Sequence, residues 1–583
     1  MSLDKFTEYK IEQNAYAAFD ALSMQQLLID RLRATTNLTD QDFEGSNAQG
    51  IIDIVAQTYH TLLFYLNQSS SENLLSQAQI WENMNRVVSG LDFKPVGYRS
   101  PIVNVHITNS GENEVNVPLY SYVTTGDTQW NLSNNIAIKA GNIFQTLLYE
   151  GKWREYPKQE ALGITNEIIN IALVDILGAN ANLIDHNNIH VYVKGSDDVW
   201  RVWKEVESFY ESNKNDRHYT KRLNERGLYD ITFGNNVNGN TLNVGSTVKI
   251  MYLESSGKSI KAGDIANLKL NVFRTDDIVD IIADTGILVS DQVDLDLLSS
   301  TNKTPSTTIQ TPQDVDTIRE LAPKILSTQK RVVTLSDIEA VLENEFSHIL
   351  KSFQVVSNKE LDDIVSAYYN TDYKDVIDNV TSIYNQSLFS SSCAFSNVYV
   401  FGGSGQYINN ESIRVSDSAK QLIVDKFEKL KSPTMNIVIM DPVDLSLDLF
   451  TSKSMNDISD VDDTIIVIKR DRSIQVDVNE IRSNAVGVIS KYLAVDECGI
   501  GGEIDLLKMN SEINNLQGVK SISIRYISPD NNIIESEGLS FVIWDKNNPK
   551  FKSQILTRNI KLEKFQQVQF NNIDNLTSRI IIE

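Results

Sequence analysis

Hydrophobic residues recur at helical spacing through residues 48–66 of the chain. The intervals between them are three and four residues, so a helix would gather them on one face. The positions are Ile52, Val55, Tyr59, Leu62 and Leu66, flanked by Ile51, Ile54, Leu63 and Phe64. A helix that is apolar over so wide an arc needs packing partners on more than one side.

A second helix is predicted from about Glu72 to Ser89, with Gly90 placed to end it and Pro95 forbidding continuation. An amphipathic helix within residues 4–38 is expected to pack on this pair. Residues 1–100 are therefore either a helical hairpin in a globular core or a bundle that docks other chains. In the second interpretation the interface residues are Ile52, Val55, Tyr59, Leu62, Leu66, Leu74 and Trp81.

From Ile102 the hydrophobic period changes to two, which is typical of a β-strand. Strand patterns continue to about residue 275, and Asn238-Gly239 is expected to form a hairpin turn between the strands 229–233 and 247–253. Residues 276–313 lack helical periodicity and are rich in Asp, Ser and Thr, so we expect a linker or hinge there.

Helices and strands are mixed in the remainder of the chain. Ala322-Pro323 is expected to break a helix, and Thr334 to cap another over 335–346. Arg319 is expected to form surface ion pairs, and a helix capped at Ser416 is predicted to reach Leu430.

These patterns predict an α+β multidomain fold. It would comprise an N-terminal helical bundle region, a β-rich middle domain, α/β sandwich domains toward the C-terminus and a β-like C-terminal tail. The expected parts are residues 1–100, 101–275, the hinge 276–313, 314–450 with an insertion near 360–395, 451–530, and 531–583 as a dimerisation or edge segment.

The charge composition of the chain argues against some classes of binding partner. The 583 residues include 53 Lys and Arg against 77 Asp and Glu, a formal net charge of −24. Such a balance argues against broad binding to nucleic acid or to an anionic membrane. The start of the chain lacks a signal-peptide pattern and no apolar run reaches membrane-spanning length, so folding in a cytoplasm is expected.

Candidate chemistry is sparse, and we expect no catalytic residue, no cofactor and no metal. Cys393 and Cys498 are expected to be reduced and buried. His106 and His190 are expected to be solvated on the polar sides of strands. Residues Asp291, Asp294 and Asp296 lack the glycine and the closing glutamate of a calcium loop. Gly402 to Gly405 lack the Gly-Lys-Ser/Thr of a phosphate loop and are expected to end a strand.

Three strings in the chain resemble one protein family. They are Asp42-Phe43-Glu44-Gly45-Ser46 with the following helices up to Tyr98-Arg99-Ser100, the segment 229–253, and the segment 316–346 with Thr328-Gln329-Lys330-Arg331-Val332-Val333-Thr334. The chain thereby resembles the baseplate wedge subunits of T-even-type contractile-tailed bacteriophages, within the J-like baseplate protein family.

The resemblance implies a non-enzymatic scaffold in the tail baseplate of a virion, assembled in the host cytoplasm. Such subunits dimerise, link wedges into a ring around the central hub and rearrange when the sheath contracts. Expected partners are a second copy and other wedge proteins, with hub or sheath-initiating proteins as further candidates, and neither nucleic acid nor membrane.

Two alternatives stay open. A glycan-binding or depolymerising tail protein could use Trp130, Trp153, Trp200 and Trp203 to stack on sugars, unless these residues fill the β core. The equivalent baseplate protein of a bacterial contractile injection system would share the same fold.

Overall fold

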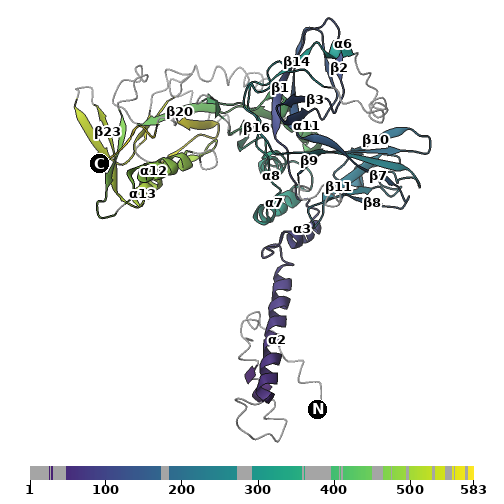
Figure 1. Cartoon of the computed structure of the whole chain (residues 1–583), viewed down its shortest axis with the longest axis horizontal. Helices are drawn as coiled ribbons and strands as arrows, with labels where there is room; N and C mark the ends of the chain where they lie inside the picture. The colour runs from purple at the N-terminus through teal and green to yellow at the C-terminus, as the bar shows by residue number, and fades with distance from the viewer. Residues whose placement is uncertain are drawn as a thin grey trace. The chain divides into compact units, whose positions relative to one another are not determined.

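The computed structural model describes residues 25–26, 28–30, 47–171, 183–271, 292–357, 360, 396–405, 407–408, 411–449, 464–474, 476–493, 498–527, 532–544, 554–556, 559–570 and 576–583 (Figure 1). The chain forms two compact units, Met1–Lys94 with Asp314–Ala322, and Pro95–Gln313 with Pro323–Glu583. The fold is mixed α/β: the described part of the first unit is helical, and the second is dominated by β-sheets.

The first unit contains the long helix α2 (Asn47–Ser71) and the short helix α3 (Trp81–Ser89). The predicted helix over 72–89 therefore begins later than expected, at Trp81, although it does end at Gly90. Of the predicted N-terminal helix, residues 25–26 and 28–30 are described and helical, and Gln25 Nε2 donates to Asp53 Oδ1 of α2 at 2.6 Å. The rest of that prediction lies outside the described residues.

The N-terminal part of the second unit contains two β-sheets, in which most neighbouring strands are antiparallel. The first has the order β14 (Leu298–Thr301), β1 (Ile102–Asn109), β6 (Ile143–Glu150), β4 (Thr128–Asn131) and β3 (Tyr122–Thr125). The second has the order β7 (Lys152–Glu160), β13 (Thr247–Glu254), β9 (Ile184–Lys194), β10 (Trp200–Glu205), β11 (His218–Leu223), β12 (Tyr229–Phe233) and β8 (Ile168–Ile171). Strands β2 (Val115–Val117) and β5 (Ile136–Ile138) form a separate pair. The alternation predicted for β1 is confirmed, because Val103, Val105 and Ile107 are buried.

The seven-stranded sheet curls so that its two edge strands approach each other. Tyr156 Oη of β7 donates to the carbonyl of Asn170 in β8 at 3.1 Å. The hairpin predicted around Asn238-Gly239 is wrong, because β12 and β13 are not neighbours in this sheet. The local turn nevertheless forms: Asn235 Oδ1 accepts from the N–H groups of Val237 and Asn238, and Gly239 has a φ of +77°.

The predicted hinge is also wrong over its described part, residues 292–313. Helix α6 (Gln292–Leu295) is followed by β14, which pairs antiparallel with β1, and Leu295 and Leu298 are buried in the core beneath. Thr307 Oγ1 accepts from the N–H of Ile102 at 2.9 Å, which fixes the segment farther along. Residues 276–291 lie outside the described residues.

Helices and a three-stranded sheet follow. The sheet has the order β15 (Ser352–Ser357), β16 (Ser396–Gly403) and β19 (Met435–Met440), beside the pair β17 (Tyr407–Ile408) and β18 (Glu411–Ser412). The helices are α7 (Val315–Thr328), α8 (Leu335–Phe346) and α11 (Asp417–Leu430). Apart from Glu360, the predicted insertion near 360–395 lies outside the described residues.

Local capping predictions for these helices are confirmed. Thr334 and Asp337 form a reciprocal capping box at the start of α8, and Ser416 Oγ accepts from the N–H of Ala419 at the start of α11. The break predicted at Pro323 is wrong, since α7 continues through it. Proline removes one backbone donor, and the burial of Leu321 and Ala322 beside it favours an uninterrupted helix.

The β-rich region and the α/β region share one hydrophobic core. Ile102, Tyr149 and Leu253 of the β-sheets pack with Leu342 of α8 and Ile423 of α11. Burial of apolar area is the main favourable term in folding, so residues that share a core stabilise each other. The regions expected at 101–275 and 314–450 are therefore packed as one body rather than as independent domains.

The C-terminal region has its own core, which includes Leu447, Ile466, Ile489 and Phe541. One sheet has the order β26 (Gln554–Leu556), β25 (Phe541–Trp544), β20 (Val443–Leu449) and β28 (Gln566–Phe570), and the other β24 (Ile533–Glu537), β23 (Val519–Ile527), β21 (Ile465–Arg470) and β29 (Ile580–Ile582). Its helices are α12 (Val478–Tyr492) and α13 (Leu506–Asn514), and β22 (Glu503–Ile504) pairs with β27 (Ile560–Lys561).

The segment 531–583 therefore contains strands, as predicted, but these complete the two sheets that begin at Val443 and Ile465. A buried ion pair joins them, with Arg579 Nη1 2.8 Å from Asp448 Oδ1. Removing one partner of such a pair would leave an uncompensated buried charge, so the pair ties the end of the segment to β20.

His190 is not a solvated histidine as expected, because its ring packs against Trp153 with 4.9 Å between centroids. Its Nδ1 lies 2.9 Å from Tyr120 Oη, which in turn lies 2.6 Å from Tyr192 Oη. Burial, together with the charge of Lys221, lowers the pKa of His190 to about 4. The ring is therefore neutral in the folded protein near pH 7.

Acid should destabilise the protein partly through His190. Its folded pKa lies below the unfolded value of about 6.5, so the unfolded chain binds more protons between these pH values. The free energy of unfolding is then fully retained above about pH 6.5 and falls by about 2 kcal/mol as the pH drops to about 4.5.

Denaturant unfolding followed by tryptophan fluorescence at both pH values measures this loss. His190→Gln should show about 2 kcal/mol less acid dependence of the free energy of unfolding than the unaltered chain. An unchanged acid dependence in His190→Gln would contradict the assignment.

Candidate protein-interaction surface

Helix α2 exposes an unusual amount of apolar side-chain surface. Ile52 and Ala56 are buried, but several large apolar side chains on the same helix are exposed, with Leu62 57% exposed. The exposed set comprises Ile51, Ile54, Val55, Tyr59, Leu62, Phe64, Tyr65 and Leu66. Single exposed apolar residues are ordinary, whereas a contiguous exposed patch marks an interaction site.

The exposed residues form a seam along the helix. Ile51, Val55, Thr58, Leu62 and Tyr65 follow one another at intervals of four and three residues, which is the spacing of a coiled-coil seam. We call these five residues the α2 seam. A shallow groove of about 580 Å³ runs beside it, lined by Asp53, Ile54, Gln57, Thr58, Thr61, Leu62 and Tyr65. A second helix fits such a seam by inserting its own side chains between these positions.

The α2 seam is almost free of charge. Asp53 is the one carboxylate among the 25 residues of α2, which contain no lysine or arginine. The hydroxyls of Thr58 and Thr61 donate to the carbonyls of Ile54 and Gln57, one turn back in the helix. These polar groups are thus satisfied within the helix, so the seam can be covered by an apolar partner without leaving hydrogen bonds unmade.

The seven predicted interface residues differ in their exposure to solvent and in the elements that carry them. Val55, Tyr59, Leu62 and Leu66 are exposed on α2, while Ile52 of the same helix is buried. Leu74 is exposed in the turn that follows α2, and Trp81 is half-buried at the start of α3. The structure therefore brings four of the seven together as an exposed group.

Glu72 holds the connection between α2 and α3, a role that the sequence does not reveal. Its carboxylate accepts from the N–H groups of Gln79 and Ile80 and from Asn83 Nδ2 at 3.1–3.3 Å. Burial acts to raise the pKa of Glu72, but these bonds and one from Gln68 outweigh it and lower the pKa below its ordinary value. No local motif distinguishes Glu72 from a surface glutamate.

Arg319 of α7 reinforces the same connection. Its Nε donates to the carbonyl of Leu75 at 3.2 Å and its Nη2 to that of Ala78 at 2.6 Å. It also forms the ion pair with Asp316, so the predicted surface pairing is confirmed in part. The two carbonyl contacts hold the turn between the helices in one conformation.

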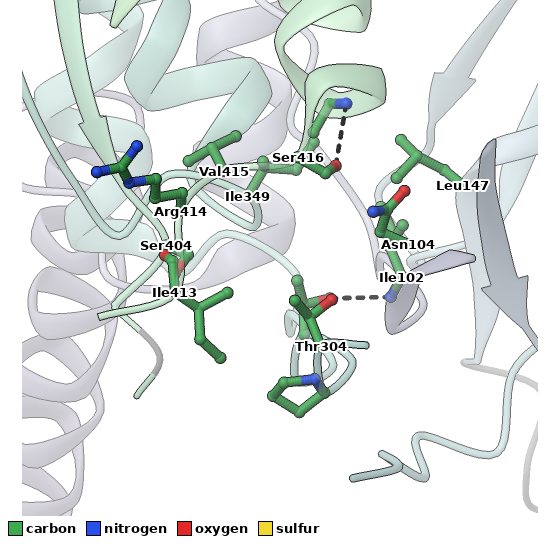
Figure 2. A pocket seen from close by; sticks show the side chains of 13 residues that line it. Ile102, Asn104, Leu147, Thr304, Ile349, Ser404, Ile413, Arg414, Val415 and Ser416 are labelled. Carbon is green, nitrogen blue, oxygen red and sulfur yellow. Dashed lines mark hydrogen bonds between the residues drawn. The ribbon is translucent and has the colours of Figure 1, made fainter. Parts of the chain in front are cut away.

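A second hollow lies in the other unit, between β1, β6, the segment 304–307 and the start of α11 (Figure 2). Its volume is about 60 Å³, enough for about two water molecules. Asn104, Thr304, Ser404 and Arg414 supply polar groups, and the lining contains no Asp, Glu, His or Cys. The hollow therefore has no pair of side chains for general acid–base catalysis.

Other candidate chemistry receives no support from the described residues. Among these residues there is no group of three or more His, Cys, Asp and Glu side chains that could hold a metal ion. Of the aspartates considered for a calcium loop, Asp296 has its Oδ1 atom 3.9 Å from Lys269 Nζ, and Asp291 lies outside the described residues. Cys498 is buried, as expected, and burial raises the pKa of its thiol to about 11; Cys393 lies outside the described residues.

The tryptophans proposed for sugar stacking fill the β core instead. Trp130, Trp200 and Trp203 are buried, and Trp153 packs edge-on against Tyr120 with 4.6 Å between centroids. A sugar needs an exposed ring face, so the core interpretation is confirmed for the three buried residues.

No described helix is both long and apolar enough to cross a bilayer.

Neutralising Glu72 should loosen the start of α3. Glu72→Gln replaces a carboxylate acceptor by a weaker amide, so the amides of Gln79 and Ile80 should exchange faster with deuterium. Glu82→Gln, at an exposed position in the first turn of α3, is the matched control and should leave exchange unchanged. Equal exchange in both variants would show that Glu72 does not hold the connection.

Comparison with known proteins relates this chain to contractile baseplates. No protein-family model matches the sequence. The sequence is 21% identical over 363 residues to the baseplate wedge protein gp6 of Enterobacteria phage T4, covering 58% of this chain and 51% of that protein. The chain thus spans about half the length of the curated relative it matches.

Two solved structures are similar over most of their own length. One is a chain of the anti-feeding prophage (AFP) baseplate, with 10% identity, a TM-score of 0.28 and coverage of 95% of this chain and 98% of that one. The other belongs to the type VI secretion system TssK-TssF-TssG baseplate subcomplex, with 9% identity, a TM-score of 0.27 and coverage of 67% and 96%. Because these TM-scores are low, the relationship to a contractile baseplate protein rests on the sequence match, which defines no specific family.

Proposed function

We propose that this chain is a structural subunit of a contractile-tail baseplate, and that the α2 seam packs against helices of neighbouring subunits. The observation that carries the proposal is the row of exposed apolar side chains on α2 at coiled-coil spacing. The sequence match to a baseplate wedge protein supports the baseplate setting.

Burial of the α2 seam would supply a substantial driving force for association. Each large apolar side chain that becomes fully buried contributes about 1.5–3 kcal/mol. The seam contributes four such side chains, Ile51, Val55, Leu62 and Tyr65, each about half exposed in the single chain, so covering them is worth on the order of 3–7 kcal/mol before the costs of association. A helix of 25 residues is about 38 Å long, which suits an extended helical contact.

The finer assignment follows the resemblance of the sequence to wedge subunits. In this proposal the chain dimerises, links wedges into a ring around the hub and rearranges when the sheath contracts. Its partners are then a second copy and other wedge proteins, and its location is the tail baseplate of a virion. The role needs no catalytic group, so the chain is proposed to be a scaffold and not an enzyme.

The equivalent subunit of a bacterial contractile injection system remains the second candidate. The same seam and the same packing chemistry would serve there, and the genes adjacent to this one distinguish the two. The glycan-binding hypothesis loses its main support, since three of its four tryptophans are buried.

A charge in the α2 seam should prevent assembly. Leu62→Asp places a carboxylate where an apolar partner is proposed to pack, at a cost of about 3 kcal/mol or more, or at least about 100-fold in affinity. The variant should fold normally because Leu62 is exposed in the single chain. Light scattering of the chain mixed with the products of neighbouring tail genes measures the association.

Phe64→Asp is the matched control on the same helix. Phe64 is 59% exposed, close to the 57% of Leu62, but two residues along a helix place it about 200° around the axis. The affinity of the Phe64→Asp variant for the neighbouring tail proteins should change by less than about tenfold if the α2 seam is the contact. Normal assembly of Leu62→Asp, or equal loss in both variants, would contradict the seam assignment.

A further inference from the structure

We propose that residues 161–168 and 234–246 form a second docking surface, which binds a protein subunit different from this chain. We call these two segments the loop platform. The inference rests on the proposed function, because it places the platform against another component of the same assembly. It concerns the β-rich region and is independent of the α2 seam.

The loop platform presents apolar side chains to solvent. Val244 is 82% exposed and Leu162 is 69% exposed, and Ile164, Ile168 and Val237 are also exposed. The two segments touch directly, because a Cβ on Gly163 would come within 2.5 Å of Val244 Cγ2. The exposed residues therefore belong to one surface and are not scattered positions.

Backbone hydrogen bonds hold the two segments together. Ala161 N–H donates to the carbonyl of Ser246 at 2.8 Å, and Gly245 N–H donates back to the carbonyl of Ala161 at 2.9 Å. At the other end, Asn166 N–H donates to the carbonyl of Gly234 at 3.1 Å. The shape of the platform is thus set before any partner binds, which lowers the entropy lost on docking.

Glu167 fixes the inside of the first segment. Its carboxylate accepts from the N–H groups of Leu162 at 2.8 Å and Gly163 at 3.1 Å, and the residue is buried. The negative charge therefore holds the loop from within and is not displayed to a partner. Leu162 and Ile164 are presented outward from this fixed loop.

The loop platform is depleted in charge relative to the chain. Charged residues make up 22% of the sequence, so 21 residues would contain about five, yet the two segments contain only the buried Glu167. Asparagines occupy many of the remaining polar positions. Depletion of charge around exposed apolar residues is typical of the centre of a protein–protein interface. The absence of lysine and arginine from both segments disfavours nucleic acid or an anionic membrane as the partner.

The charge of the whole chain selects between a second copy and a different subunit. Two copies that each carry a net charge of −24 repel each other, and the platform exposes five large apolar side chains to offset this repulsion, against eight on α2. A different subunit with an apolar centre and a basic rim would instead be attracted by the net negative charge of this chain. We therefore assign the platform to a heterologous partner of that chemistry.

Photo-cross-linking in complete baseplates tests the assignment. A photoreactive amino acid replaces Val244, and the cross-linked product is identified by mass spectrometry. The control position is Arg226, which is exposed in the turn at the opposite end of β12. The expected result is a cross-link from position 244 to a different baseplate subunit and none from position 226.

The outcomes separate this inference from the proposed function. A cross-link from 244 to a second copy, or none in baseplates that contain the chain, overturns the loop platform and leaves the scaffold role intact. Absence of the chain from baseplates overturns both.

A second measurement compares two charge substitutions. Val244→Glu should lower incorporation of the chain into baseplates at least tenfold with an unchanged melting temperature, whereas Arg226→Glu should not lower it. Equal incorporation of the two variants overturns the inference.

Discussion

Apolar surface must be removed from water, and in this chain that requirement is met unevenly. The second unit has continuous buried cores in addition to the exposed apolar residues of the loop platform, whereas α2 keeps a row of large apolar side chains exposed along its length. Exposure of this kind is costly in a single chain and becomes favourable when a partner covers it. The proposed role in a baseplate follows from this imbalance, because an assembly supplies the covering subunits.

Within the first unit, fixed connections support the end of α2. Glu72 and Arg319 hold the turn between α2 and α3 through hydrogen bonds to backbone groups. In the second unit, Leu253 of β13 and Leu342 of α8 share one core, so the β-rich and α/β regions behave as a single body. A helix whose connecting turn is fixed by hydrogen bonds is suited to a scaffold, because its contact can form without reorganising that turn.

Features encoded within a few residues could be predicted from the sequence. The capping box of Thr334 and Asp337, the cap at Ser416 and the alternation along β1 all depend on neighbouring positions, and all are confirmed. The face of α2 was likewise visible as helical spacing, although the sequence could not show that Ile52 is buried while Leu62 is exposed.

Features that depend on distant contacts could not be predicted. Strand β14 has four residues, too few for a clear period, and it forms because β1 provides an edge for it. Helix α7 passes through Pro323, and His190 packs against Trp153, because of their surroundings and not their neighbours in sequence. The role of Glu72 arises from amides seven and eight residues away that only the folded turn brings within reach.

The most direct test of the central claim is hydroxyl-radical footprinting of α2 in the free chain and in assembled baseplates. Oxidation reports the exposure of individual side chains, and Tyr65 of the seam and Phe64 outside it are adjacent aromatic residues that are both exposed in the single chain. The account predicts strong protection of Tyr65 on assembly and weaker protection of Phe64. Equal oxidation of Tyr65 in the free and assembled states would contradict it.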